Sequence, residues 1–161
     1  MQISDDDKKF MRRAIELARQ GMDSQSGGPF GCIIAKDGSI VGEGMNQVTS
    51  TNDPTAHAEI VAIRNACKNL DSFQLDGCVV YTSCEPCPMC LGAIYWARPK
   101  HIYIACNRDD AAVAGFDDAF IYNELCATDF EQRKVPIFSL MRDEGRAVFQ
   151  SWIEKPDKTE Y

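Results

Sequence analysis

One imidazole, one carboxylate and two thiols lie in this sequence at spacings that suit a metal ion and an activated water. One residue separates His57 from Glu59, and two residues separate Cys87 from Cys90. Zinc prefers sulfur and nitrogen ligands, and three protein ligands leave the fourth position of its tetrahedron for water. A carboxylate beside that water is suited to carrying its protons. We therefore predict that His57, Cys87 and Cys90 bind one zinc ion and that Glu59 is a catalytic acid–base.

The expected position of the two thiols at the start of a helix favours their ionisation. Pro88 suits the first turn of a helix, which places Cys87 at its cap and Cys90 on the same face. The exposed N–H groups and the positive dipole end of a helix lower the pKa of a thiol there. For His57 and Glu59 to reach one site, the geometry of their helix matters, because residues two apart on a helix point about 200° apart around its axis. They reach one site only if the first turn of their helix abuts it.

A closed zinc site is the structural alternative to this catalytic arrangement. Cys84 lies three residues before Cys87, so a Cys3His site with His57 is chemically possible. Such a site leaves Glu59 without a role. We instead expect Cys84 at the end of a strand, facing the core or lining the pocket, and His101 in a surface or packing role.

Hydrophobic periodicity predicts the elements that position these residues. Helices are expected over 4–20, from Asp53-Pro54 to residue 70, and over 88–97, 119–125 and 144–152. The apolar face of the second helix is predicted to consist of Ala56, Ile60, Ile63, Cys67 and Leu70. Strands are expected over 30–35, 40–45, 78–82 and 101–106, with a strand or an extended arm over 135–141. Residues 109–118 are expected to form a loop, with room for a helical turn at 111–114. Two successive strand–helix–strand passages indicate parallel strands with helices on both faces of a sheet.

Composition and charge narrow the class of substrate. The chain has 161 residues, which favours one domain, and a net charge of −7, which argues against a large nucleic-acid interface. A small neutral or weakly charged substrate fits better. We see neither a secretory segment nor an apolar run of the ~18 residues that a membrane helix needs, so we expect a cytoplasmic protein that does not bind membranes. The eight cysteines are then metal ligands and buried thiols rather than disulfides.

Three segments carry a resemblance to a known family. His57-Ala-Glu59, the run from Thr82 to Cys90 and the run from Leu91 to Arg98 resemble the cytidine deaminase superfamily of zinc-dependent base deaminases. Within it the sequence is most similar to the bacterial-type guanine deaminases. The features of that branch are Gly27-Gly-Pro-Phe30, Asn52-Asp-Pro-Thr-Ala-His57, Ala114-Gly-Phe-Asp-Asp118 and a terminal Tyr161. The similarity runs from about Phe10 to Tyr161 and is weakest over 126–159.

The resemblance implies a fold, an activity and an assembly. The fold is a single α/β domain over 1–161, a three-layer α/β/α sandwich with a mixed five-stranded sheet. The activity is that of a hydrolase of purine catabolism, which converts guanine to xanthine and ammonia with one Zn²⁺ per subunit. The assembly is a homodimer in which the arm 126–161 is swapped between subunits, so that its last residues cap the partner's site. The base is held by Phe30, Asn46, Ala58, Trp96, Asp118 and Tyr161, and Asp118 is a second catalytic acid near the exocyclic amine.

Other activities share the core motif. A sibling deaminase acting on guanosine, cytosine or ammeline needs only a different pocket shape. A tRNA adenosine deaminase has the same zinc motif but needs a basic surface for RNA, which the net charge opposes. A structural zinc domain used for protein contacts is the alternative that is not an enzyme.

Overall fold

A mixed four-stranded sheet in the order β2-β1-β3-β4 organises the first part of the chain. The computed structural model describes residues 3–160, and contacts divide the chain into two units, Met1–Asp118 and Ala119–Tyr161. The elements of the first unit are α1 (Asp5–Asp23), β1 (Gly31–Lys36), β2 (Ser39–Met45), α2 (Val48–Thr51), α3 (Ala58–Leu70), β3 (Val79–Cys84), α4 (Pro88–Ala97), β4 (His101–Cys106) and α5 (Arg108–Val113).

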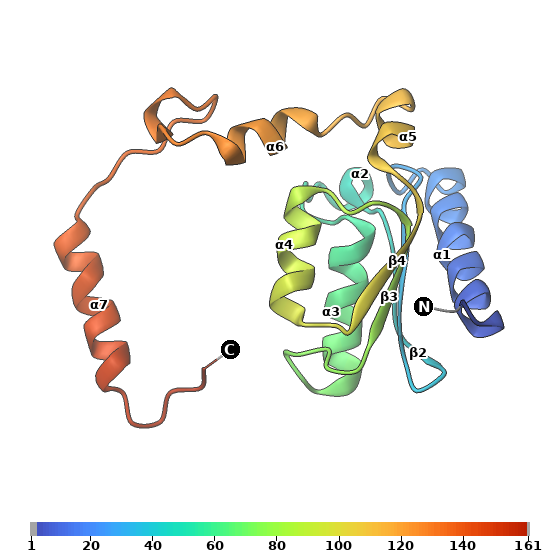
Figure 1. Ribbon diagram of the computed structural model, residues 1–161, viewed down its shortest axis with the longest axis horizontal. Coiled ribbons are helices and arrows are strands. Elements are labelled where there is room, and N and C mark those ends of the chain that lie inside the picture. The colour runs from blue at the N-terminus through green and yellow to red at the C-terminus, as the bar shows by residue number, and fades with distance from the viewer. Residues whose placement is uncertain (1–2, 161) are drawn as a thin grey trace. The chain divides into compact units, whose positions relative to one another are not determined.

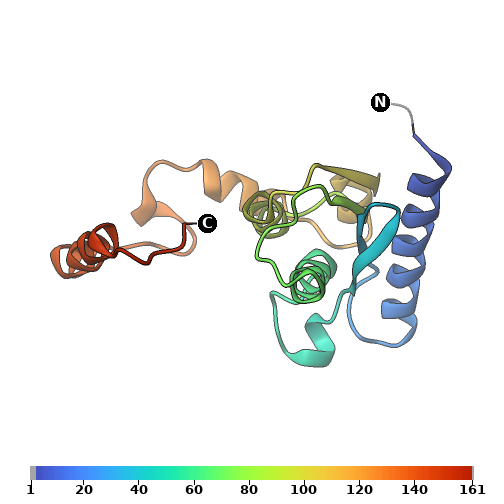
Figure 2. The same ribbon diagram turned by 90° about the horizontal axis from the view of Figure 1, so that it is seen from below.

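Helices cover both faces of this sheet, as predicted. α1 lies on one face, and α3 and α4 lie on the other (Figures 1 and 2). Phe10 and Leu17 of α1 pack with Ile33 and Tyr81 on the first face. The second face buries small and β-branched side chains, which are those of Cys32, Ile34, Val80, Ala58, Ala62 and Ala66. Burial of these two apolar surfaces provides the main driving force for folding of this unit.

The strand directions confirm part of the parallel arrangement and correct the strand count. β3 and β4 are parallel neighbours joined through α4, whereas β1 is antiparallel to both β2 and β3. The expected five-stranded sheet is wrong, because the described residues form four strands. Residues 135–141 belong to no strand, and Pro136 within them lacks the N–H that a sheet ladder requires.

The predicted start of the second long helix is also wrong. α3 begins at Ala58 rather than at Pro54, because the Asp53 side chain accepts hydrogen bonds from the amide and the hydroxyl of Thr55, at 2.8 and 2.7 Å. These bonds close a turn instead of capping a helix. The cap of α3 is His57, with an extended backbone at φ −67° and ψ 155°.

Alanines, not the predicted isoleucines, form the most deeply buried face of α3. Ala58, Ala62 and Ala66 are fully buried, whereas Ile60 and Ile63 are only partly buried. The reason lies in β2, where Gly42 and Gly44 face the helix. A Cβ built on Gly44 would lie 2.6 Å from the backbone nitrogen of Ala62 and closer still to the carbonyl oxygen of Ala58. The helix backbone therefore rests directly on the strand backbone.

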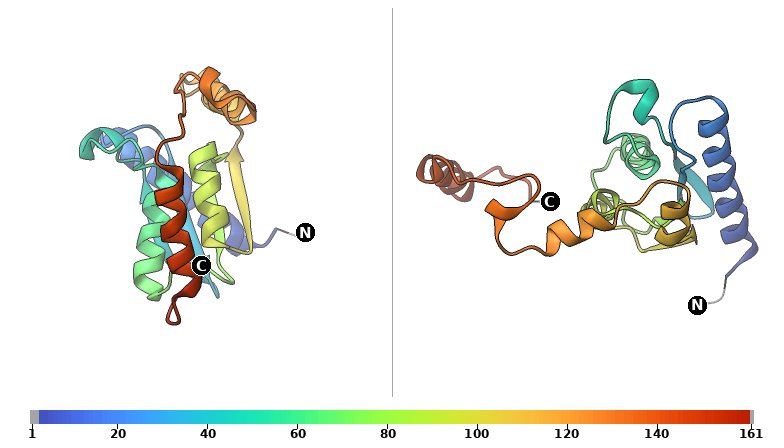
Figure 3. Two further views of the ribbon diagram at one scale, coloured as in Figure 1. Left: turned by 90° about the vertical axis from the view of Figure 1, so that its left-hand side faces the viewer. Right: turned by 90° about the horizontal axis from the view of Figure 1, so that it is seen from above.

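The second unit consists of short helices without an internal core. Its elements are α6 (Ala119–Cys126), the 3-10 helix η1 (Phe130–Gln132) and α7 (Arg142–Glu154), drawn in orange and red in Figure 3. No residue of these three elements is buried. α6 and α7 confirm the helices predicted over 119–125 and 144–152. Among residues 3–160, no helix is both long enough and apolar enough to cross a bilayer.

Candidate active site

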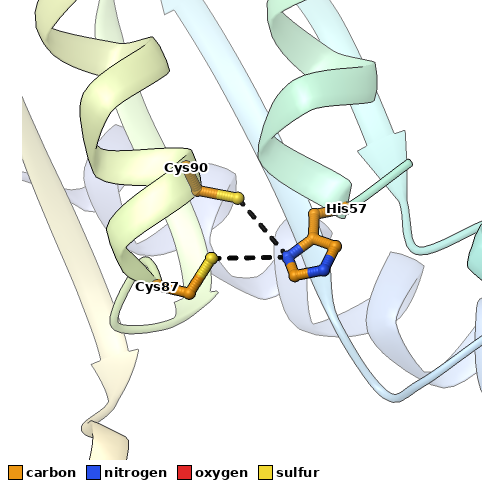
Figure 4. A group of neighbouring side chains, drawn as sticks. All are labelled: His57, Cys87 and Cys90. Atoms are coloured by element: carbon orange, nitrogen blue, oxygen red, sulfur yellow. Dashed lines mark hydrogen bonds between the residues drawn. The ribbon is translucent and has the colours of Figure 1, made fainter. Parts of the chain in front are cut away.

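The predicted zinc ligands come together at the starts of two helices. His57 is the cap of α3, Cys87 is the cap of α4, and Cys90 lies in the first turn of α4. The Nδ1 atom of His57 is 3.6 Å from the sulfur of Cys87 and 3.5 Å from that of Cys90 (Figure 4). Zinc bond lengths of about 2.3 Å to sulfur and 2.0 Å to nitrogen place tetrahedral ligand atoms about 3.6 Å apart. The three side chains therefore fit zinc.

The electrostatics of this cluster favour a thiolate. The pKa of Cys87 is lowered to about 4, first by the hydrogen bond from Cys90 and then by the one from His57. The same interaction raises the pKa of Cys90, which is the proton donor of the pair, and the Cys87 thiolate raises the pKa of His57. The N-terminal end of α4 stabilises negative charge at Cys87 as well. A negatively charged thiolate at Cys87 favours the binding of a cation in this cluster.

Glu59 lies in the first turn of α3 and is buried beside this cluster. The hydroxyl of Thr82 donates a hydrogen bond to its Oε1 at 3.2 Å. Burial raises the pKa of Glu59, and the negative charge of Cys87 acts in the same direction. The helical separation of about 200° does not apply to His57 and Glu59, because His57 is extended and precedes the helix. The first turn of α3 abuts the site, as the geometric condition required.

Cys84 stands apart from the ligand cluster. It is the last residue of β3, is buried, and donates its S–H to the carbonyl oxygen of Asn107 at 3.4 Å. Among the described residues, the one group placed to hold a metal ion consists of His57, Cys87 and Cys90. This arrangement does not support the closed Cys3His site, and it confirms Cys84 at the end of a strand. His101 begins β4 and packs edge-on against Tyr103, in the packing role expected for it.

Asn46 directly follows β2 and is buried with a fixed amide orientation. Its Oδ1 accepts a hydrogen bond from the backbone N–H of Val48 at 3.1 Å, so its NH₂ group is the side of the amide left to face a ligand. Gly27 lies against this amide, and a Cβ there would be 2.9 Å from Cγ of Asn46 and closer still to Oδ1. Ala58 is buried at the first position of α3, where a backbone N–H has no acceptor within the helix. Both residues can donate hydrogen bonds.

The remaining predicted contact residues differ in their surroundings. Phe30 is partly buried, and Trp96 on α4 is 65% exposed. Asp118 is partly buried; burial raises its pKa, and the negative charge of Cys87 adds to this effect. Tyr161 lies outside the described residues.

Phe116 is a residue that the sequence analysis did not single out. Its ring packs edge-on against Phe30, with the centroids 4.9 Å apart and the planes at 85°. Its place two residues before Asp118 is the signal that could have drawn attention to it.

Comparisons with known proteins agree with the geometry. The family model described as the cytidine and deoxycytidylate deaminase zinc-binding region matches residues 4–106, a range that contains all three ligand positions. A guanine deaminase of Bacillus subtilis (strain 168) is 55% identical over 152 residues, which are 94% of this chain and 97% of the relative. An X-ray structure of guanine deaminase from Bacillus subtilis has a TM-score of 0.92 at 54% identity and covers 96% of this chain and 98% of its own. A tRNA-specific adenosine deaminase of Haemophilus influenzae is 38% identical over 167 residues, 94% of this chain and 96% of the relative.

Proposed function

The chain belongs to the cytidine and deoxycytidylate deaminase family, and from that premise we propose that it hydrolyses guanine to xanthine and ammonia. The observation that carries the proposal is a zinc-type ligand set with a buried carboxylate beside it, His57, Cys87, Cys90 and Glu59, in a chain 55% identical to a guanine deaminase over 94% of its length. The relative that acts on tRNA is more distant, at 38% identity.

Glu59 carries the protons of this reaction. A zinc ion held by His57, Cys87 and Cys90 supplies a positive charge that makes a water molecule more acidic. Glu59 accepts a proton from the attacking water, passes it to a ring nitrogen of guanine, and helps ammonia to leave as the C2–N bond breaks. Its raised pKa suits both accepting and returning a proton. Thr82 orients the carboxylate through its hydroxyl.

Residues around the ligand cluster recognise the base. Asn46 presents its NH₂ group, and Ala58 its backbone N–H, to acceptor atoms on the edge of guanine. Phe30 packs on the base. Asp118 acts as a second acid near the exocyclic amine, and burial raises the pKa of its carboxyl. Trp96 adds a further contact, and the terminal Tyr161 is contributed by the arm of the other subunit.

The proposed assembly is a homodimer in which residues 126–161 of one subunit close the site of the other. The support is the absence of buried residues in α6, η1 and α7, although these elements expose large apolar side chains: Phe120, Leu125, Phe130, Val148, Phe149 and Ile153. A segment of this kind gains stability only by packing on another surface. Sedimentation equilibrium tests the dimer, and a monomer at micromolar concentration contradicts it.

We place the protein in the cytoplasm. All eight cysteines are free thiols in the structure, although Cys106 and Cys126 are exposed rather than buried as expected. A reducing compartment keeps thiols in that state and the metal ligands available.

Ammonia release from a panel of bases tests the activity. Guanine, guanosine, adenine, cytosine and ammeline are compared at equal concentration with the zinc-loaded protein. We expect guanine to react fastest, and a preference for any other member contradicts the proposed substrate. Glu59→Gln keeps the size of the side chain and removes its acid–base function. It should abolish turnover with zinc still bound, and near-normal activity in this variant contradicts the role of Glu59.

A further inference from the structure

We propose that Phe116 is a positioning residue, whose ring packs on Phe30 beside Gly28 and so fixes the loop that carries Asp118. The inference rests on the proposed function, in which Phe30 contacts the base and Asp118 acts near its amine. Phe116 itself is not a catalytic residue, because its effect passes through Asp118.

The backbone after α5 turns Phe116 back toward the sheet. Gly115 has a φ of +91°, a region that favours glycine, and no atom lies within 4 Å of a Cβ built on it. The amide of Gly115 donates to the carbonyl oxygen of Ala112 at 3.0 Å, and that of Phe116 donates to the carbonyl oxygen of Ala111 at 2.9 Å. These bonds close the end of the helix, so the chain reverses and the Phe116 ring meets Phe30.

The contact between the two rings depends on a glycine beside them. Centroids 4.9 Å apart at 85° form an edge-to-face pair, the arrangement that aromatic quadrupoles favour. A Cβ on Gly28 would lie 3.0 Å from Cε1 and Cζ of Phe116 and 3.0 Å from Cε2 of Phe30. A side chain at this position therefore pushes on both rings at once.

The position of the Phe116 ring affects the position of the Asp118 carboxylate, because the two residues are close in the chain. One residue separates Phe116 from Asp118, so displacement of the ring displaces the carboxylate. Asp118 is partly buried and within electrostatic reach of Cys87, a predicted ligand. The loop thus links the side chain expected to pack on the base to the carboxylate expected beside its amine.

A double-mutant cycle in the zinc-loaded protein tests the proposal. Phe116→Leu removes the aromatic contact, and Asp118→Asn removes the acid on which Phe116 is inferred to act. We expect Phe116→Leu to lower kcat about ten-fold with KM changed less than about three-fold. In the Asp118→Asn background the same change should cost less than about two-fold, because the two residues act as one unit. Phe116→Tyr keeps the ring and should restore kcat to within about two-fold of the starting protein.

Controls separate this role from a general effect on folding. Phe73→Leu alters a phenylalanine of similar exposure, 57% against 44% for Phe116, in the loop between α3 and β3, and should leave kcat unchanged. Should Phe116→Leu not fold, Gly28→Ala displaces the same rings by a smaller change and should show the same loss of additivity with Asp118→Asn.

The results distinguish this proposal from the proposed function. The wild-type protein is assayed first on the base panel, and failure to act on guanine contradicts the proposed function alone. The cycle is then measured on whichever base reacts fastest. Additive losses from Phe116→Leu and Asp118→Asn, or no rescue by Phe116→Tyr, overturn the positioning role even when guanine is the substrate.

Discussion

Replacing Gly44 of β2 with alanine is expected to displace the first turn of α3, which carries Glu59 and follows His57. The added methyl group would lie 2.6 Å from the nitrogen of Ala62 and closer to the oxygen of Ala58, whereas real Cβ contacts essentially never fall below 3.0 Å. The obstacle is helix backbone, which has no rotamer to change. α3 and β2 must therefore separate by at least the shortfall of 0.4 Å at Ala62, and by more at Ala58, the residue between His57 and Glu59.

The magnitude follows from that displacement. Overpacking of a tight core contact costs about 1–3 kcal/mol, which for a chain of this size lowers the melting temperature by roughly 2–12 °C. Misplacing catalytic groups by about 1 Å reduces turnover about 100-fold. The shortfall at Ala58 is close to that distance and the one at Ala62 is about half of it, so we expect Gly44→Ala to lose about ten- to 100-fold in kcat and about 2 kcal/mol of unfolding free energy.

Urea denaturation and steady-state ammonia release measure the two effects in the same preparation. Gly92→Ala is the matched control, because a Cβ on Gly92 of α4 has no atom within 4 Å and alanine favours helix by up to about 1 kcal/mol. The control should be at least as stable as the wild-type protein and equally active. If Gly44→Ala matches the control in both stability and kcat, the close approach of α3 to β2 does not position the site.

Three further perturbations give separate results. Thr82→Val removes the hydroxyl that donates to Glu59 while keeping the shape of the side chain, so kcat should fall about ten- to 100-fold with the zinc content unchanged. The loss of a buried hydrogen bond should also lower the unfolding free energy by about 1–3 kcal/mol. An unchanged kcat contradicts the orienting role. Tyr81→Phe removes a 2.6 Å hydrogen bond to Asp7, the main cause of the lowered pKa of that carboxyl. Because the pKa of Asp7 is lower in the folded state, the ionised carboxylate contributes stability above pH 3.8, at most about 1 kcal/mol for so exposed a group, and this contribution is lost as the pH falls through the folded-state pKa. The unfolding free energies of the wild-type protein and Tyr81→Phe, measured in urea from pH 7 to pH 3, should therefore converge. A difference that stays constant with pH contradicts the role of Asp7. Removing zinc with a chelator should abolish ammonia release. It should also lower the melting temperature by roughly 8–16 °C, because a tightly bound ion stabilises the folded state by about 4 kcal/mol. Added zinc should restore both, and activity that survives complete removal of zinc contradicts a zinc enzyme.

Hydrophobic periodicity predicted most of the helices and strands of the first unit. α4 and β4 have the predicted bounds, and α1 extends three residues beyond the predicted end at residue 20. The start of α3 was mispredicted because Asp53-Pro54 is an equally good signal for a turn, and only the hydrogen bonds to Thr55 decide between the two. The predicted apolar face of α3 was right in part, because Ile63, Cys67 and Leu70 pack against the core, but it omitted the fully buried Ala58, Ala62 and Ala66, which the close approach of Gly42 and Gly44 requires to be small. The alternation of Gly42 and Gly44 along a strand was the available signal.

The site was predictable to the extent that its chemistry fixes residue types. Zinc needs sulfur and nitrogen, so His57, Cys87 and Cys90 stand out by spacing, and the structure brings them together. The contact between Phe116 and Phe30 was not predictable from residue type, because an aromatic residue in a loop carries no distinctive chemistry and the contact spans 86 positions; the position two residues before Asp118 was the available signal. Contacts of that kind follow from the fold rather than from local sequence.

The proposed use of two helix caps as metal ligands implies a trade-off between stability and activity. Neither His57 nor Cys87 makes a side-chain capping hydrogen bond, so α3 and α4 both begin without the interaction that serine, threonine, aspartate or asparagine would supply, worth about 0.5–2 kcal/mol each. Substitutions that improve these caps would stabilise the chain in a selection for thermal resistance carried out without metal. The same substitutions would remove two of the proposed zinc ligands, so such a selection would yield a protein that is more stable to heat but inactive.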